Sequence, residues 1–171
     1  MSGGATPLSR VLTVDRDLSA QAGQLMNQYF GCLDLRDFEG AAACFTADAS
    51  SEYGGLELER GRGAIVEFLR GALGSALSSR HATTSVLAER TSDTTAQCET
   101  AAVVHIVRAI GGESPQLHIR GVRYSDELVL ADGEWLIGKR VHRGEWAAVH
   151  DVTVLDEPEF RRGADGSLRR G

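Results

Sequence analysis

The chain has 171 residues, 42% of them hydrophobic and 25% charged, which is the composition of a single globular domain with a sizeable core. Its 24 acidic and 18 basic residues give a net charge of −6, which argues against a surface that binds nucleic acid or an anionic membrane. The chain shows no charged segment followed by an apolar run at its start, and no stretch approaches the ~18 apolar residues of a membrane helix. We therefore expect a cytoplasmic protein.

Helical periodicity recurs in the first half of the chain. Apolar side chains follow helical spacing over residues 18–33, again in a short segment over 38–45, and a third time over 63–77. Between the second and third segments, Gly54-Gly55 separates two short extended runs and predicts a tight hairpin.

The second half changes pattern. Runs rich in Val, Ile, Thr and aromatic residues, without a helix-length apolar stripe, cover residues 81–91, 95–109, 116–131 and 134–147. Gly111-Gly112 and Asp132-Gly133 separate the last three runs, and Asp-Gly is a strong hairpin signal. Helices followed by a meander predict an α+β fold, with about three N-terminal helices packed against a strongly curved antiparallel sheet.

We expect one domain over residues 17–149. It is preceded by a flexible arm (1–16) rich in Gly, Ser and Thr, and followed by a tail (150–171) that docks in part and is then mobile. The strand runs carry apolar residues on both alternating faces, more than one core covers. That excess predicts a homo-oligomer formed through the outer face of the sheet.

Three residues are the first candidates for chemistry. Asp34 ends the first helical segment, where a carboxylate opposes the helix dipole, so it is a better functional candidate than Asp37, which suits a helix start. His81 opens the first strand run. His105 lies among aliphatic residues in the next one, so we expect it to be partly buried and neutral.

Each candidate also has a structural interpretation. Asp34 could form a turn, His81 could be a surface residue of a strand, and His105 could be a core histidine with satisfied hydrogen bonds.

Cofactor sites lack sequence support. His118 and His142 show neither HxH nor HExxH spacing, and Gly61-Arg62-Gly63 lacks the rest of a phosphate-binding loop. The three cysteines form no CxxC pair, so we expect reduced and mostly buried thiols. We predict neither a metal nor another cofactor.

Several short segments together suggest a family: Tyr29 to Phe38, Cys44 to Asp48, Arg80-His81, Tyr124 to Leu128, and Asp132 to Trp135. In combination they resemble SnoaL-like proteins of the NTF2-like superfamily, and most of all scytalone dehydratase and the bile-acid dehydratases. The resemblance covers about residues 15–147. It implies a cone-shaped α+β domain that encloses a pocket for a small hydrophobic substrate.

The resemblance also implies roles for individual residues. Asp34 matches the aspartate that pairs with the catalytic histidine, and His81 matches that histidine. His105 falls where scytalone dehydratase has a second histidine, and Tyr53 where it has a water-holding tyrosine. Tyr29 lies five residues before Asp34, as a functional tyrosine does in the bile-acid enzymes.

The chain departs from the family pattern at other positions. Leu33 replaces the tyrosine that precedes the catalytic aspartate, and Val122 and Tyr124 replace a serine and an asparagine that contact the substrate. These departures leave the substrate open. Phe30 and Trp146 are further candidates for lining the pocket.

A histidine held by a carboxylate has a fixed tautomer and a raised basicity, and it can remove a proton next to a carbonyl. A pair of tyrosines can then stabilise the enolate that forms. We therefore expect a cofactor-independent lyase or isomerase of dehydratase type, acting on a hydrophobic cyclic metabolite such as a polyketide, steroid or terpenoid. The alternatives are a polyketide cyclase or epoxide hydrolase on the same scaffold, or a non-catalytic protein, either a ligand carrier or a subunit like the small one of ring-hydroxylating dioxygenases.

Overall fold

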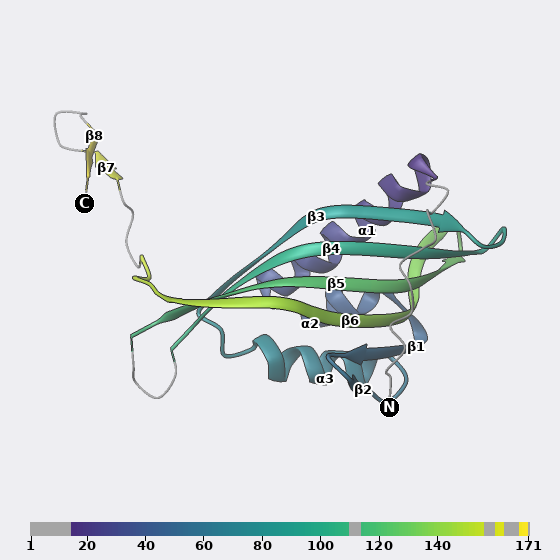
Figure 1. Ribbon diagram of the computed structural model, residues 1–171, viewed down its shortest axis with the longest axis horizontal. Coiled ribbons are helices and arrows are strands. Elements are labelled where there is room, and N and C mark those ends of the chain that lie inside the picture. Colours follow the sequence, from purple (N-terminus) through teal and green to yellow (C-terminus); the bar gives the residue numbers. More distant parts are fainter. Residues whose placement is uncertain (1–14, 110–113, 156–159, 163–167, 171) are drawn as a thin grey trace, which may run out of the picture.

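Three helices lie against one face of a six-stranded, strongly curved and unclosed sheet (Figure 1). The computed structural model describes residues 15–109, 114–155, 160–162 and 168–170. The helices are α1 (Arg16–Leu35), α2 (Phe38–Ala43) and α3 (Arg62–Leu73). The strands are β1 (Phe45–Tyr53), β2 (Leu56–Glu57), β3 (Ser78–Arg90), β4 (Thr95–Arg108), β5 (Gln116–Ala131) and β6 (Glu134–Asp151), in the order β2-β1-β6-β5-β4-β3.

The sheet is mixed, which corrects the expectation of a purely antiparallel one. Strand β1 runs parallel to β6, with Ser51 opposite Arg140 and Tyr53 opposite His142, whereas all other neighbours are antiparallel. Phe45, expected in the second helix, begins β1. The parallel pairing arises because α3 carries the chain from β1 to the far edge of the sheet, so that β1 meets β6 only after the meander has returned.

The first helix has defined limits at both ends. The side chain of Asp15 caps its N-terminus by accepting a hydrogen bond from the backbone N–H of Leu18 at 3.0 Å. At the other end Arg36 adopts a left-handed conformation with φ 63°, which ends the helix. Asp37 then caps α2 by accepting a hydrogen bond from Gly40, the role expected for it.

The ends of the chain are described only in part. The expected arm lies outside the described residues except for Asp15 and Arg16. In the tail, β7 (Phe160–Arg162) pairs with β8 (Leu168–Arg170) in a separate two-stranded sheet. Docking was expected for the part of the tail before residue 163; Leu155 in that part is 72% exposed, and residues 156–159, 163–167 and 171 lie outside the described ranges. Among the residues described, no helix has the length and apolar character needed to span a bilayer.

An ion pair lies fully buried between α1 and the sheet. The guanidinium of Arg140 donates to Asp126 through Nε at 2.8 Å and Nη2 at 2.6 Å, and neither side chain is exposed. The rings of Tyr29, Phe45 and Tyr124 surround the guanidinium, with centroids 4.4, 5.1 and 4.6 Å from its central carbon. The cation is therefore compensated by one carboxylate and by three aromatic faces.

Removing one member of this pair should destabilise the fold strongly. We expect Asp126→Ala to lower the free energy of unfolding by ~3–5 kcal/mol, because it leaves a buried cation without its counter-ion. The double variant Asp126→Leu/Arg140→Met should recover most of that loss. Urea unfolding followed by circular dichroism measures both.

The control is Glu145→Ala, which breaks a partly exposed ion pair with Arg123 and should cost at most ~1 kcal/mol. Similar small losses for Asp126→Ala and Glu145→Ala would show that the buried pair does not hold the fold together.

Candidate active site

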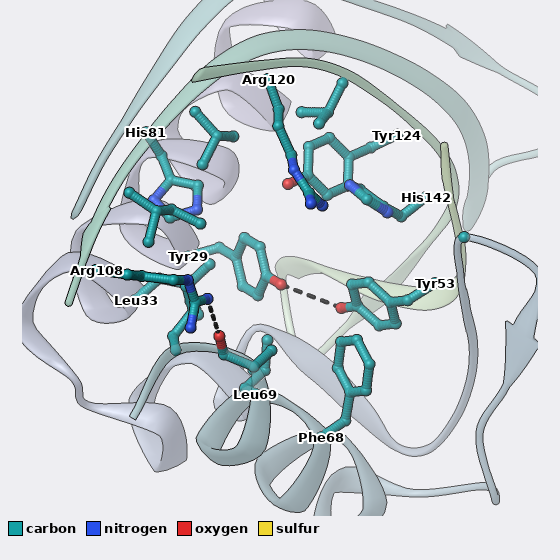
Figure 2. A pocket seen from close by; sticks show the side chains of 16 residues that line it. Tyr29, Leu33, Tyr53, Phe68, Leu69, His81, Arg108, Arg120, Tyr124 and His142 are labelled. Carbon is teal, nitrogen blue, oxygen red and sulfur yellow. Dashed lines mark hydrogen bonds between the residues drawn. The ribbon is translucent and has the colours of Figure 1, made fainter. Parts of the chain in front are cut away.

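A cavity of about 250 Å³ lies between the helices and the inner face of the sheet. Its apolar wall includes Leu33, Phe68, Leu69, Val104 and Val122. Figure 2 shows the polar side chains that point into it: Tyr29, Tyr53, His81, Arg108, Arg120, Tyr124 and His142. Polar groups gathered in a largely apolar cavity are typical of a binding or catalytic site.

Asp34 and His81 are in direct contact. His81 Nδ1 lies 2.7 Å from Asp34 Oδ1, and the backbone N–H of His81 donates to Asp34 Oδ2 at 3.0 Å. The hydroxyl of Ser79 donates to Oδ1 at 2.8 Å. The carboxylate thus holds the imidazole through both its ring and its backbone.

The turn after Asp34 supports this contact. Arg36, in its left-handed conformation, directs its guanidinium back to the helix end and across to β3. Its Nη1 donates to the carbonyl of Leu33 at 2.8 Å and to Ser79 Oγ at 2.7 Å. Because Ser79 accepts from Arg36, its own proton is free to point to Asp34. The side chains of Arg36 and Ser79 therefore link the end of α1 to the start of β3 beside the dyad.

Burial and hydrogen bonding act in opposite directions on the two pKa values. Burial tends to raise the pKa of Asp34, but the hydrogen bonds from His81 and Ser79 outweigh it and the pKa is lowered. Burial is the largest influence on His81 and lowers its pKa, although Asp34 opposes it. This differs from the expected rise in basicity. Phe30 accounts for part of that burial, since it stacks on the imidazole at 5.1 Å and 19°.

The dyad is therefore a carboxylate beside a neutral imidazole at neutral pH. Nδ1 carries the proton that Asp34 accepts, which leaves the lone pair on Nε2 available to a ligand. The side chain of His81 is 4% exposed and lines the cavity. The arrangement suits a general base that works out of contact with bulk water.

A pair of phenols forms another part of the cavity wall. The hydroxyls of Tyr29 on α1 and Tyr53 on β1 lie 3.1 Å apart. Burial raises the pKa of both groups, so both stay protonated and can donate hydrogen bonds. The guanidinium of Arg140, which is buried in the core, lies over the ring of Tyr29. The phenols are positioned to stabilise negative charge on an oxygen atom.

The structure also brings in residues that the sequence patterns did not indicate as site candidates. His142 lines the cavity from β6, opposite Tyr53 on one side and Tyr124 on the other. Burial, followed by the nearby arginines, lowers its pKa to about 4. Arg108 and Arg120 project from β4 and β5. Period-two alternation through Val122 would have placed Arg120 on the same face.

Most of the expected site residues lie at the cavity. Tyr29, Tyr53, His81, Val122 and Tyr124 all line the cavity. Phe30 lies behind His81 and is buried, so it supports the imidazole and does not line the cavity.

His105 and Trp146 lie elsewhere, which corrects their expected place in the pocket. Val104 and Ile106 line the cavity, so His105 between them points to the opposite face of β4. Trp146 is 52% exposed and covers Gly121, where an added Cβ would lie 2.1 Å from the indole nitrogen. A β-bulge between Gly121 and Val122 shifts the register beside it.

Within the described ranges, no cluster of three or more His, Cys, Asp or Glu side chains has a geometry that could hold a metal ion. Cys32, Cys44 and Cys98 are free thiols, two of them buried, as the sequence predicts.

Comparisons with known proteins agree with this fold. The protein Rv3472 of Mycobacterium tuberculosis, of unknown function, is 30% identical with a TM-score of 0.63 over 74% of this chain and 70% of its own. ActVI-ORFA of Streptomyces coelicolor is 26% identical, with a TM-score of 0.64 over 75% of this chain and 98% of its own. A putative scytalone dehydratase of Novosphingobium aromaticivorans is 23% identical, with a TM-score of 0.66 over 80% and 88%. Comparison with curated proteins gives no match.

A family model described as a SnoaL-like domain matches residues 17–141. This match spans α1 to the middle of β6 and includes the dyad, both phenols and the buried ion pair. It confirms the resemblance seen in the sequence. The chain belongs to the SnoaL-like family of NTF2-like proteins.

Proposed function

We propose that this protein is a cofactor-independent lyase or isomerase of dehydratase type, in which His81 is the base and Asp34 its positioning partner. The observation that carries the proposal is the 2.7 Å contact between Asp34 Oδ1 and His81 Nδ1 at the wall of an aromatic-lined cavity. The substrate is a hydrophobic cyclic compound with a carbonyl group, such as a polyketide, steroid or terpenoid.

The chemistry follows from the protonation states. Nε2 of His81 takes a proton from the carbon next to the substrate carbonyl, and the imidazolium that forms is stabilised by the Asp34 carboxylate. The electron pair moves onto the carbonyl oxygen, which accepts a hydrogen bond from one of the two neutral phenols, while the other phenol donates to the first. The imidazolium then returns the proton to a leaving hydroxyl, which departs as water, or to another carbon.

The dyad favours an enzyme over a carrier. Enclosing a carboxylate and an imidazole at an apolar cavity costs free energy that ligand binding alone does not require. A ring-closing cyclase would use the same first step, because the enolate could attack a second carbonyl of the same substrate. That alternative changes the product and leaves the roles of His81 and Asp34 as they are.

Loss of either member of the dyad should abolish most of the activity. We expect His81→Ala to lower the rate by at least ~10²-fold, the usual contribution of a positioned base. Asp34→Asn should do comparable damage, because the amide can favour the wrong tautomer of His81. The assay is exchange of α-protons for deuterium in a panel of hydrophobic cyclic ketones, followed by NMR.

Arg123→Gln, on the outer face of β5, is the control and should exchange at the wild-type rate. Circular dichroism checks that all variants are folded. Undiminished exchange in His81→Ala would exclude His81 as the base.

The rate should depend on pH through His81. Because its pKa is lowered from 6.5, the base is already neutral at pH 7, so activity should rise with pH and level off below the ordinary titration range of histidine. The raised pKa values of Tyr29 and Tyr53 predict no decline between about pH 7 and 9. A pH profile of kcat/KM tests this. A rate that falls as the pH rises through 6.5 would mean that the protonated imidazole is the active form.

The phenols should matter for the chemical step more than for binding. We expect Tyr29→Phe or Tyr53→Phe to lower kcat by ~10²-fold, as loss of one donor to a developing oxyanion does, with a much smaller change in KM. The stability of the fold should change by no more than ~1.5 kcal/mol, because only one hydrogen bond is lost. Steady-state kinetics and urea unfolding separate the effects. A change in KM alone would assign the pair to ground-state binding.

A further inference from the structure

The cavity has a charge imbalance that the proposed reaction does not use. Arg108 and Arg120 both line it, whereas no carboxylate among the described residues does. Asp34 is behind His81 and is occupied by the hydrogen bonds described above. The protein as a whole carries a net charge of −6, so the charge of the cavity lining is opposite in sign to that of the protein.

Arg120, on β5, differs from two other arginines of β5 and β6, which form ion pairs. On β5, Arg123 pairs with Glu145 at 2.8 Å, and on β6, Arg143 pairs with Glu52 at 2.7 Å. Arg120 has no hydrogen bond or ion pair with any side chain or carbonyl in the described part of the chain. Arg120 is an exposed residue of β5, and Figure 2 shows that its guanidinium extends into the cavity. Its donors are free to meet a ligand there.

One neighbour of Arg120 adds to this polar end of the cavity. Arg108 is not that neighbour, because it pairs with Gln116, four residues from Arg120 on β5, and its Nη2 donates to the carbonyl of Ala72 in the last turn of α3. His142 has its Nδ1 buried with no hydrogen-bond partner among the described residues. A buried ring nitrogen without a partner is unusual in a folded protein, and a ligand atom would satisfy it.

The strand register places this polar end relative to the base. His81 on β3 is opposite Val104 on β4, and Val104 is opposite Arg120 on β5. The three residues form one row across the inner face, with His81 and Arg120 separated by two strand spacings, about 10 Å between their backbones. The two side chains therefore start from different strands, and a ligand that contacts both does so with two different parts of its structure.

We propose that the substrate carries a carboxylate at the end remote from the reacting carbon, and that Arg120 binds this group, with His142 beside it. The planar guanidinium matches a carboxylate with two parallel hydrogen bonds, which makes Arg suited to this anion. The proposal extends the proposed function by naming the substrate class as hydrophobic cyclic acids. It rests on the proposed function for the identity of the reacting end only.

The test compares two ligands of nearly the same shape, 2-naphthoate and the uncharged 2-naphthamide, by isothermal titration calorimetry at about pH 7.5. We expect the full-length wild-type protein to bind naphthoate at least ~10-fold more tightly, because the charge strengthens the hydrogen bonds. Arg120→Gln should abolish that preference while keeping the affinity for naphthamide within ~2-fold. The matched control Arg123→Gln should behave as wild type, because Arg123 lies on the outer face of the same strand and pairs there with Glu145.

A second variant separates this inference from the proposed function. His81→Ala should keep the preference for naphthoate, because the anion site is two strands away from the base. Equal affinities for the two compounds, an unchanged preference in Arg120→Gln, or no binding of either compound would overturn the carboxylate site. A preference that survives together with full proton exchange in His81→Ala would overturn the proposed base and leave the anion site in place.

Discussion

The site depends on the hydrogen bonds that replace water around the carboxylate of Asp34. A charged oxygen is tolerated in a half-buried position only where donors replace its hydration. Asp34 has three of them: the ring and backbone of His81 and the hydroxyl of Ser79. Those bonds join the end of the first helix to the start of the third strand. The same interaction therefore closes one side of the cavity and fixes the ring that faces it.

A second polar centre supports the part of the cavity wall that the phenols form. The ion pair of Arg140 and Asp126 lies between the sheet and the first helix, and the ring of Tyr29 rests on the guanidinium. Strand β6 carries Arg140 in the core and His142, two residues on, at the cavity, so one strand serves both the interior and the site. Both phenols lie on regular elements, Tyr29 on α1 and Tyr53 on β1, so the packing of these elements fixes their positions.

Much of the fold and part of the site could be predicted because the relevant signals are local. The apolar stripe over 18–33 indicates the first helix, and the position of Asp34 against the helix dipole distinguishes it from the other acidic residues nearby. The contact with His81 depended on the family resemblance, since the two residues are 47 positions apart. The face of His105 was missed because its aliphatic neighbours are compatible with either side of a strand.

Other features depend on long-range register. The pairing of β1 with β6 joins segments about ninety positions apart, and no turn signal between them indicates it. An unbroken hairpin about Asp132-Gly133 would put Val141 opposite Tyr124. A bulge between Glu127 and Leu128 shifts the register by one residue, with Gly138 unpaired, and brings His142 there. One inserted residue thus decides which side chain enters the cavity.

The tautomer of His81 tests the central claim most directly, because it does not require a known substrate. In protein labelled with ¹⁵N at histidine, with the His81→Asn variant to assign the signals, two-bond ¹H–¹⁵N correlation spectra distinguish the two neutral forms and the imidazolium. At pH 7 we predict a neutral ring with its proton on Nδ1, and loss of that single form in Asp34→Asn. A ring that is protonated on Nε2, or charged at pH 7, would contradict the assignment of His81 as a base held by Asp34.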